Sequence, residues 1–247
     1  EVAVEIELSG KTVTIGGMCK GAGMIAPKMT VPHATMLCCI TTDCIISNEL
    51  LASMLGGVID DSFNKVTVDG DRSTNDTVIV MANGASGVEI KPGSPDELHF
   101  KVALTMVAQH LARAIAMDGE GATKFVSVEV RGAASVRDAE VCARTIANSL
   151  LCKTAWFGCD PNWGRVLAAA GRSGASFSPE NVSLDYDEMP VVRNGIDAGT
   201  PESELAQVLK RGEFTIKLDL GEGHGTFTVW TSDISYEYVK INADYHT

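Results

Sequence analysis

The chain has 247 residues, 45% of them hydrophobic, which is enough for one large domain or two modest domains with packed cores. Its formal net charge is −12 and it has no cluster of lysine and arginine, which argues against binding to a nucleic-acid backbone as the main activity. The sequence shows no signal peptide and no apolar run of about 18 residues, so we expect a soluble globular protein without a membrane span.

The sequence opens with a predicted β-hairpin that leads into a glycine-rich loop. The segments VAVEIEL and KTVTIGG alternate between apolar and polar residues, and Ser9-Gly10 separates them. The following stretch GGMCKGAG (16–23) is no Walker loop, because no Ser or Thr follows a GK pair. Its glycines instead allow the backbone to approach a ligand or a peptide bond closely.

Two strands and a helix follow the loop. TMLCCITT (35–42) predicts a fully buried strand and TVIVMANG (77–84) a second strand. Between them, SNELLASMLGGVIDDSF (47–63) predicts a helix with Ser47 as its N-cap.

The clearest helix is predicted over residues 95–117. Ser94 can cap it, Pro95 suits its first turn, and Glu97 completes a capping box. Its apolar positions share one face: Leu104, Val107, Leu111 and Ile115. Charged and polar residues interrupt this pattern, so we expect a core helix.

The second half of the chain mixes strands and helices. DGEGATK (118–124) is the most plausible domain hinge. After it we predict a strand at 126–131, helices at 135–150 and 163–171, a strand at 182–186 and a helix at 201–211. FTIKLDL (214–220) and GTFTVWTSD (225–233) predict a hairpin turned by GEGHG, and the loop at 188–200 is the most expendable segment. This order favours an α+β architecture.

Thr35 is the main candidate for chemistry. It follows a small residue, Ala34, and precedes an apolar strand, which suits a chain that cuts itself and then uses its new amino terminus. A threonine hydroxyl is a weak nucleophile until a base lies beside it, and the α-amine of an N-terminal threonine can be that base. The alternative is an ordinary buried strand threonine.

Cysteine and metal chemistry have less support. The seven cysteines form no CxxC pair, which indicates reduced, intracellular usage. A nucleophile among Cys38, Cys39 and Cys44 is the less favoured alternative, since buried cysteines usually act as small hydrophobic residues. The histidines show no HxxxH or HxH pair, and DGDRSTND (69–76) lacks the glycine and glutamate of an EF-hand, so no metal is predicted.

Five separated motifs resemble those of one family, in that family's order. They are GGMCKGAGMIAP with ATML and ITTD, SFNKVTVDGDRSTNDT (62–77), DGEGATKF (118–125), KTAWFGCDPNWGR (153–165) and YVKINADYHT (238–247). In these motifs the chain resembles the ornithine acetyltransferase family, also called glutamate N-acetyltransferase.

The resemblance implies an α/β (α+β) fold: a layered αββα sandwich of the N-terminal-nucleophile acetyltransferase kind, with a smaller C-terminal α+β domain. Residues 1–34 would end an α-subunit segment, 35–124 would form the nucleophile-bearing domain, and 125–247 the C-terminal domain. The resemblance also implies α/β subunit pairing with an upstream segment, commonly as a heterotetramer. That upstream segment supplies the family's oxyanion-hole residues, so no residue of this chain receives that role.

The resemblance implies autocatalytic cleavage between Ala34 and Thr35, with Thr35 as the nucleophile that carries acetyl from N2-acetylornithine to glutamate in arginine biosynthesis. The family's substrate-binding residues fall on Lys20, Thr35, Glu120, Asn242 and Thr247. No cofactor is expected. Some members of the family use acetyl-CoA as a donor, and the residues here do not decide that point. A cytoplasmic location is expected, or an organelle in a eukaryote.

Two departures from the family pattern leave alternatives open. The chain carries extra residues, TVPH (30–33), just before the expected cut, and it begins at Glu1, only a few strands before Thr35. A related N-terminal-nucleophile amidohydrolase or aminopeptidase would use the same Thr35 chemistry with water as the acceptor. A truncated, unprocessed chain without catalysis is the other alternative.

Overall fold

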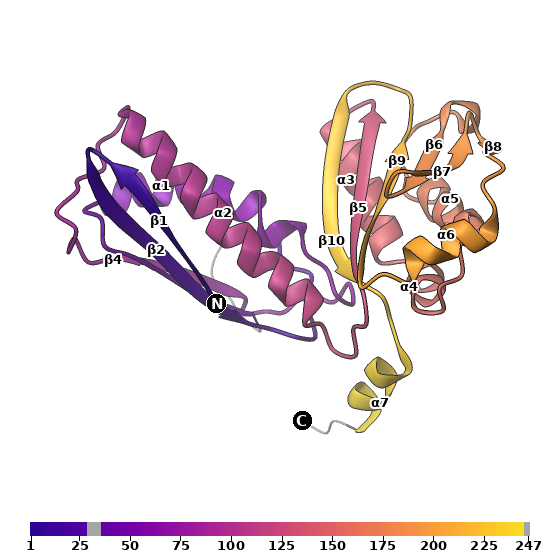
Figure 1. The fold of residues 1–247 in the computed structure, drawn as a ribbon, viewed down its shortest axis with the longest axis horizontal. Coiled ribbons are helices and arrows are strands. Elements are labelled where there is room, and N and C mark those ends of the chain that lie inside the picture. Colours follow the sequence, from indigo (N-terminus) through magenta and orange to yellow (C-terminus); the bar gives the residue numbers. More distant parts are fainter. Residues whose placement is uncertain (29–35, 245–247) are drawn as a thin grey trace. The chain divides into compact units, whose positions relative to one another are not determined.

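The structure is a computed structural model that describes residues 1–28 and 36–244. The described residues form two β-sheets and seven α-helices, which confirms the predicted mixed α/β class (Figure 1). They fall into two compact units: unit 1 is Glu1–Val66 with Gly70–Ile115, and unit 2 is Thr67–Asp69 with Ala116–Thr247. None of the described helices has both the length and the apolar character that crossing a membrane requires. The division at 34/35 and 124/125 stays a prediction.

Unit 1 holds a four-stranded sheet in the order β1-β2-β3-β4. Its elements are β1 (Val2–Leu8), β2 (Lys11–Lys20), β3 (Leu37–Thr42), α1 (Asn48–Asp60), a 3-10 turn (Phe63–Lys65), β4 (Thr77–Ala82) and α2 (Pro95–Met117). The β1/β2 and β2/β3 pairs are antiparallel, whereas β3 and β4 are parallel. The predicted opening hairpin is confirmed: Leu8 pairs with Lys11, and Ser9 and Gly10 turn the chain with φ of 49° and 74°.

The helix caps of unit 1 follow the sequence signals closely. Ser47 Oγ accepts a hydrogen bond from the Leu50 N–H at 3.2 Å, as predicted for α1. Ser94 Oγ accepts from the Glu97 N–H at 3.2 Å at the start of α2. The reciprocal half of the capping box differs, because the Glu97 carboxylate accepts from the Gly93 N–H instead of that of Ser94.

The prediction that β3 is fully buried is wrong. Cys38 and Ile40 are buried, but Leu37 on the other face is 50% exposed. The same open face exposes apolar side chains from the neighbouring strands, namely Met18, Ile79 and Met81. Both faces of β3 are apolar, but the described part of unit 1 covers only one of them.

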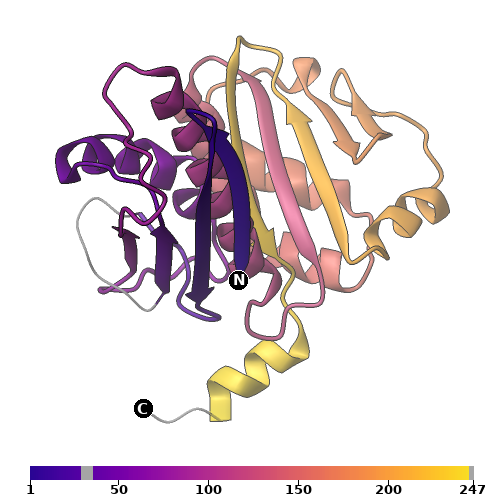
Figure 2. The ribbon, with the colours of Figure 1, turned by 60° about the vertical axis from the view of Figure 1, so that its left-hand side comes forward.

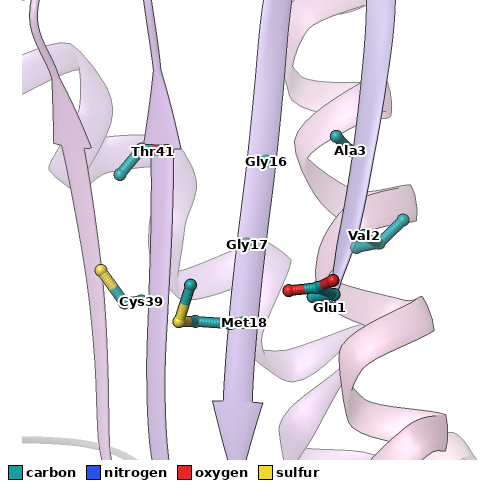
Figure 3. Close-up of a pocket in the computed structure, with 8 residues that line it drawn as sticks. All are labelled: Glu1, Val2, Ala3, Gly16, Gly17, Met18, Cys39 and Thr41. Atoms are coloured by element: carbon teal, nitrogen blue, oxygen red, sulfur yellow. The ribbon is translucent and has the colours of Figure 1, made fainter.

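A hollow of about 520 Å³ lies on the open face of this sheet (Figure 3). It forms where Gly16 pairs with Ala3 and Thr41, because the glycine has no side chain to fill the space. Met18 and Cys39 stand beside it. The open face is therefore apolar and indented.

Unit 2 holds a six-stranded sheet in the order β10-β5-β9-β6-β7-β8. Its strands are β5 (Phe125–Ala133), β6 (Ser183–Tyr186), β7 (Met189–Arg193), β8 (Ile196–Asp197), β9 (Glu213–Asp219) and β10 (Gly225–Ser232). Its helices are α3 (Val136–Ala147), α4 (Leu150–Phe157), α5 (Trp163–Gly171), α6 (Glu202–Leu209) and α7 (Tyr236–Asp244), with a 3-10 turn at Pro179–Asn181. Helices α3, α4 and α5 contribute to one hydrophobic core with β5, β6 and β9.

The single helix predicted over 135–150 is two helices. α3 ends at Ala147, and α4 starts at Leu150 because Ser149 Oγ accepts from the Cys152 N–H and caps a new helix. The additional turns of α4 bury Trp156 in the core.

The predicted hairpin of residues 214–233 is wrong. β9 and β10 do not pair; β5 lies between them, parallel to β9 and antiparallel to β10 (Figure 2). The GEGHG segment does not make a tight turn but passes over the end of β5, where the Glu222 and Gly223 N–H groups donate to the Gly132 carbonyl at 2.7 and 2.9 Å.

The prediction that residues 188–200 are expendable is also wrong. They contain β7 and β8, and Val191 and Val192 are 1% and 0% exposed in the core of unit 2. Asn194 and Gly195 turn the chain between these strands with φ of 50° and 74°.

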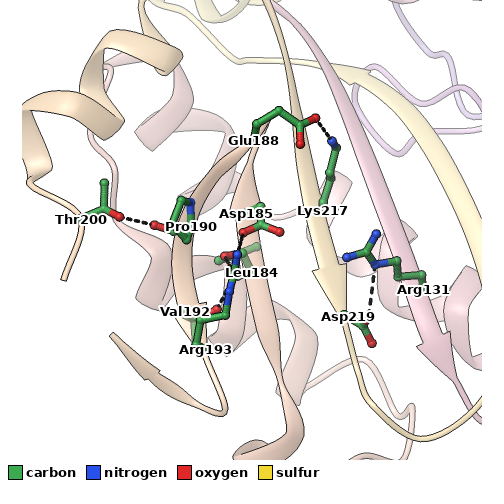
Figure 4. A network of polar contacts seen from close by, with 10 residues as sticks. All are labelled: Arg131, Leu184, Asp185, Glu188, Pro190, Val192, Arg193, Thr200, Lys217 and Asp219. Carbon is green, nitrogen blue, oxygen red and sulfur yellow. Dashed lines mark hydrogen bonds and ion pairs between the residues drawn. The ribbon is translucent and has the colours of Figure 1, made fainter. Parts of the chain in front are cut away.

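Part of the face of this sheet that lies opposite the helices is polar. Alternate residues of β5 and β9 point away from the core, including Arg131, Lys217 and Asp219. They form ion pairs: Arg131 with Asp219 at 3.1 Å, and Lys217 with Glu188 (Figure 4). Arg193 and Asp185 form a third pair on the same network, at 2.5 Å. This part of the face suits contact with water.

The crossing of GEGHG over β5 predicts a site that cannot accept a methyl group. A Cβ on Gly225 would lie 2.2 Å from the Ser135 carbonyl oxygen, so the backbone has to move. We expect Gly225→Ala to lower the free energy of unfolding by about 2–3 kcal/mol in urea titrations. Gly212→Ala is the control, because nothing lies within 4 Å of its added Cβ. A Gly225→Ala value equal to that of the control would contradict the close approach of Gly225 to the Ser135 carbonyl.

Candidate functional site

Unit 1 places Lys20 in register with the start of β3. Lys20 is the last residue of β2, is exposed, and pairs with Leu37, which is two residues after Thr35. Ala34 and Thr35 lie outside the described residues, as does the TVPH segment. The sheet thus places the candidate carboxylate-binding lysine beside Leu37, two residues after the candidate nucleophile.

Met36, the residue directly after Thr35, is held by the chain segment before β4. Its N–H donates to Asp76 Oδ1 at 2.9 Å, and its carbonyl accepts from the Thr77 N–H at 2.9 Å. Asp76 is 4% exposed and Met36 is 1% exposed. A buried carboxylate that accepts a backbone N–H is a strong anchor, so Asp76 fixes the backbone of Met36.

The glycine-rich segment has two different packing roles. A Cβ on Gly17 would lie 2.8 Å from Leu111 Cδ1, so this glycine admits α2 against the sheet. A Cβ on Gly21 would lie 3.1 Å from Ile25 Cδ1 but at an ordinary contact distance, 3.5 Å, from Met36 Cα. The close backbone approach to the cleavage segment therefore stays a prediction.

Unit 2 brings two of the predicted substrate-binding residues together. Asn242 in α7 donates through Nδ2 to Glu120 Oε2 at 2.9 Å and to the Tyr238 carbonyl at 3.0 Å. The two residues are 122 positions apart in the sequence. Glu120 lies in the loop between α2 and β5, and its other carboxylate oxygen has no hydrogen bond among those that join described residues in unit 2. Thr247 lies outside the described residues.

A buried lysine lies close to this loop within unit 2. Lys153 in α4 is 2% exposed, and its Nζ donates to Thr231 Oγ1 at 2.8 Å and to the Ser232 carbonyl. Burial lowers the pKa of Lys153 to about 7, against the opposing influence of the Asp233 and Asp69 carboxylates.

The family model for ArgJ matches residues 1–247. The chain belongs to the ArgJ family. This confirms the family that the five sequence motifs indicated.

Curated relatives and a solved structure agree with this membership. The glutamate N-acetyltransferase of Methanocaldococcus jannaschii is 51% identical over 255 residues, which cover 100% of this chain and 62% of the relative. The arginine biosynthesis bifunctional protein ArgJ of Chlorobium chlorochromatii is 49% identical, with 99% of this chain and 56% of the relative covered. The chain therefore spans less than two thirds of the length of these relatives.

The crystal structure of the arginine biosynthesis bifunctional protein ArgJ from Bacillus halodurans is similar to the present one with a TM-score of 0.79. It is 39% identical in sequence, and the match covers 83% of this chain and 97% of that chain. The ArgJ fold is thus shared over most of the described residues.

Sequence reasoning did not single out Asp76, Lys153 or Asp233, which hold the chain near the candidate residues. Asp76 stands in the polar run DGDRSTND, whose spacing suggests calcium ligands and gives no sign of a backbone anchor. Lys153 and Asp233 are both 2% exposed. Lysine and aspartate are rarely buried unless they have a partner, so their burial is not expected from the sequence. The available signal was that Asp76 and Lys153 stand in two of the matching family motifs, SFNKVTVDGDRSTNDT and KTAWFGCDPNWGR.

The structure weakens the cysteine alternative. Burial raises the pKa of Cys38 to about 12, and it also raises the pKa of Cys44. A thiol with a raised pKa has little thiolate near neutral pH and is a poor nucleophile. Within residues 1–28 and 36–244, no cluster of three or more His, Cys, Asp or Glu side chains could hold a metal ion, and the absence of a metal stays a prediction.

The low pKa of Lys153 predicts a stability that rises with pH. The unfolded lysine, with a pKa of 10.5, binds more protons than the folded one between pH 7 and pH 10.5, so folding becomes more favourable as pH rises through this window. We expect Lys153→Met to remove up to roughly 4 kcal/mol of this increase, measured by urea unfolding at pH 7 and pH 10. Lys210→Met, at an exposed position, controls for the change in net charge. Parallel pH profiles for the wild type and Lys153→Met would contradict the burial of a weakly basic amine.

Proposed function

We propose that the chain carries the nucleophile and part of the substrate site of an acetyltransferase that moves acetyl from N2-acetylornithine to glutamate. The observation that carries this proposal is the ArgJ match over residues 1–247, which includes every predicted site residue. The name of the 51% identical relative, glutamate N-acetyltransferase, supports the same reaction.

The proposed reaction starts with self-cleavage. Thr35 Oγ attacks the Ala34 carbonyl carbon, the peptide nitrogen leaves as the new α-amine, and water hydrolyses the resulting ester. The freed amine then accepts the Thr35 hydroxyl proton as general base. The anchoring of Met36 by Asp76 supports this role, because it limits the positions that the preceding residue can adopt.

Acetyl transfer then follows a ping-pong order. Thr35 Oγ attacks the acetyl carbonyl of N2-acetylornithine, and ornithine leaves with the proton. The amine of glutamate attacks the acetyl ester, which releases N-acetylglutamate and restores the hydroxyl group. Acetyl-CoA as a second donor is a further prediction, and no cofactor is required in these steps.

Amino-acid recognition is proposed to use opposite charges. Lys20 binds a carboxylate, and Glu120 binds an ammonium through a charge-assisted hydrogen bond. The hydrogen bond from Asn242 occupies Glu120 Oε2 and orients the carboxylate, which supports a role for Oε1 in contacting the substrate. Thr247 is proposed as the terminal hydroxyl of the same substrate site.

A subunit partner is also proposed. The open face of the β1–β4 sheet exposes Met18, Leu37, Ile79 and Met81 by 49–62% each, and neighbouring apolar side chains of this kind are typical of interaction surfaces. We propose that an α-type segment covers this face, in a heterotetramer of two αβ pairs. A cytoplasmic location, or an organelle in a eukaryote, stays a prediction.

The reaction is tested by measuring acetyl transfer from N2-acetylornithine to glutamate against release of free acetate. We expect transfer to exceed hydrolysis, and Thr35→Ala to lower transfer by more than about 10³-fold because both the hydroxyl and the processing step are lost. Thr12→Ala, which removes an exposed threonine of β2, should keep wild-type activity. Acetate as the main product would favour the amidohydrolase alternative, and full activity of Thr35→Ala would overturn the proposed nucleophile.

A further inference from the structure

The loop that carries Glu120 and the helix that carries Asn242 are both fastened to one short segment, Asp233 to Ser235. We infer that Asp233 and Ser235 are positioning residues that hold Glu120 and Asn242 together as one site for the substrate ammonium. The ligand class in this inference rests on the proposed function.

Asp233 fastens the loop to the end of β10. Its Oδ1 accepts from the Thr123 N–H at 2.8 Å and the Lys124 N–H at 3.0 Å, and Oδ2 accepts from the Thr123 hydroxyl. Its own N–H donates to the Lys124 carbonyl at 3.2 Å. Three hydrogen bonds to the carboxylate of Asp233, which is 2% exposed, and one from its backbone N–H define how the loop enters β5.

Ser235 joins the same loop to α7. Its hydroxyl donates to the Gly121 carbonyl at 2.6 Å and accepts from the Glu237 N–H at 3.2 Å in the first turn of the helix. One buried hydroxyl thus contacts the residue after Glu120 and the N-terminus of the helix that carries Asn242. Loss of the hydroxyl would leave a carbonyl and an N–H without this partner.

Gly121 shows how closely the two segments pack. It has φ of 64°, and an added Cβ would lie 2.4 Å from the Tyr238 nitrogen. The side chain of Tyr238 is held as well, because its hydroxyl donates to Asp69 Oδ2 at 3.4 Å. The start of α7 therefore has little freedom to move away from the Glu120 loop.

Two buried lysines form hydrogen bonds that tie the Glu120 loop and the Asp233–Ser235 segment to α4. Lys153 Nζ donates to the Ser232 carbonyl, directly before Asp233. Lys124 Nζ donates to the Trp156 and Phe157 carbonyls at the end of α4. The loop and the Asp233–Ser235 segment are thus anchored to the same helix, which favours a fixed distance between Glu120 and Asn242.

A double-mutant cycle tests whether Ser235 acts through Glu120. In enzyme whose wild-type form transfers acetyl, we expect Ser235→Ala to raise the KM for N2-acetylornithine, which carries a free side-chain ammonium, about tenfold and to change kcat less than about threefold. In the Glu120→Gln background, the same change should raise the KM less than about twofold, because the carboxylate that Ser235 positions is already lost. Equal effects in both backgrounds would overturn the inference.

A second variant and a control variant distinguish a specific effect on the site from a general loss of folding. Thr123→Val removes an exposed hydroxyl that donates to Asp233, and it should raise the KM in the same direction by about threefold. Asp187→Asn is the matched control, since Asp187 also accepts a backbone N–H, that of Thr215 at 2.7 Å, elsewhere in unit 2. It should leave the KM unchanged.

Amide hydrogen exchange gives a readout that does not need turnover. Ser235→Ala should speed exchange in both 118–124 and 236–242, whereas Asp187→Asn should not. Unchanged exchange in either segment would show that Ser235 does not join them. A wild-type enzyme without acetyl transfer would count against the proposed function, and the exchange rates would still decide whether the loop and α7 are coupled.

Discussion

The Asp233 carboxylate is the interaction on which the second half of the candidate site depends. It lies at the end of β10, accepts two backbone N–H groups from residues 123 and 124, and is 2% exposed. β10 itself occupies the sheet edge beside β5, and the loop before β5 carries Glu120. The carboxylate therefore links sheet topology to site geometry: if β10 paired elsewhere, neither the loop nor α7 would have this anchor.

The open faces of the two sheets differ in polarity. In unit 2, the face away from the helices carries ion pairs such as Arg131 with Asp219, which tolerate water. In unit 1, the corresponding face exposes Met18 at 62% and Leu37 at 50%. A group of exposed apolar side chains on one face favours a covering partner, and the proposed nucleophile precedes, in the sequence, the strand that begins with Leu37. Assembly and catalysis are thus proposed to involve the same strand.

Local signals in the sequence were sufficient where the contact itself is local. Ser47 and Ser94 cap the helices that their positions predicted, and Ser9-Gly10 makes the expected turn. Pairing over longer distances was not predictable in this way. Residues 214–233 read as a hairpin because both strands are close in sequence, but the backbone of Gly132 bonds the connecting segment and places β5 between them.

The candidate site shows the same limit. Lys20, Glu120 and Asn242 were chosen through resemblance to a family, since an exposed lysine, a loop acid and an asparagine near the end of the sequence have no local signature. The contact between Glu120 and Asn242 joins residues 122 positions apart, and only the fold reveals it. The most direct measurement is the intact mass of the protein before and after incubation with N2-acetylornithine. The account predicts a fragment that begins at Thr35 and gains one acetyl group, whereas a single uncut and unmodified mass would contradict it.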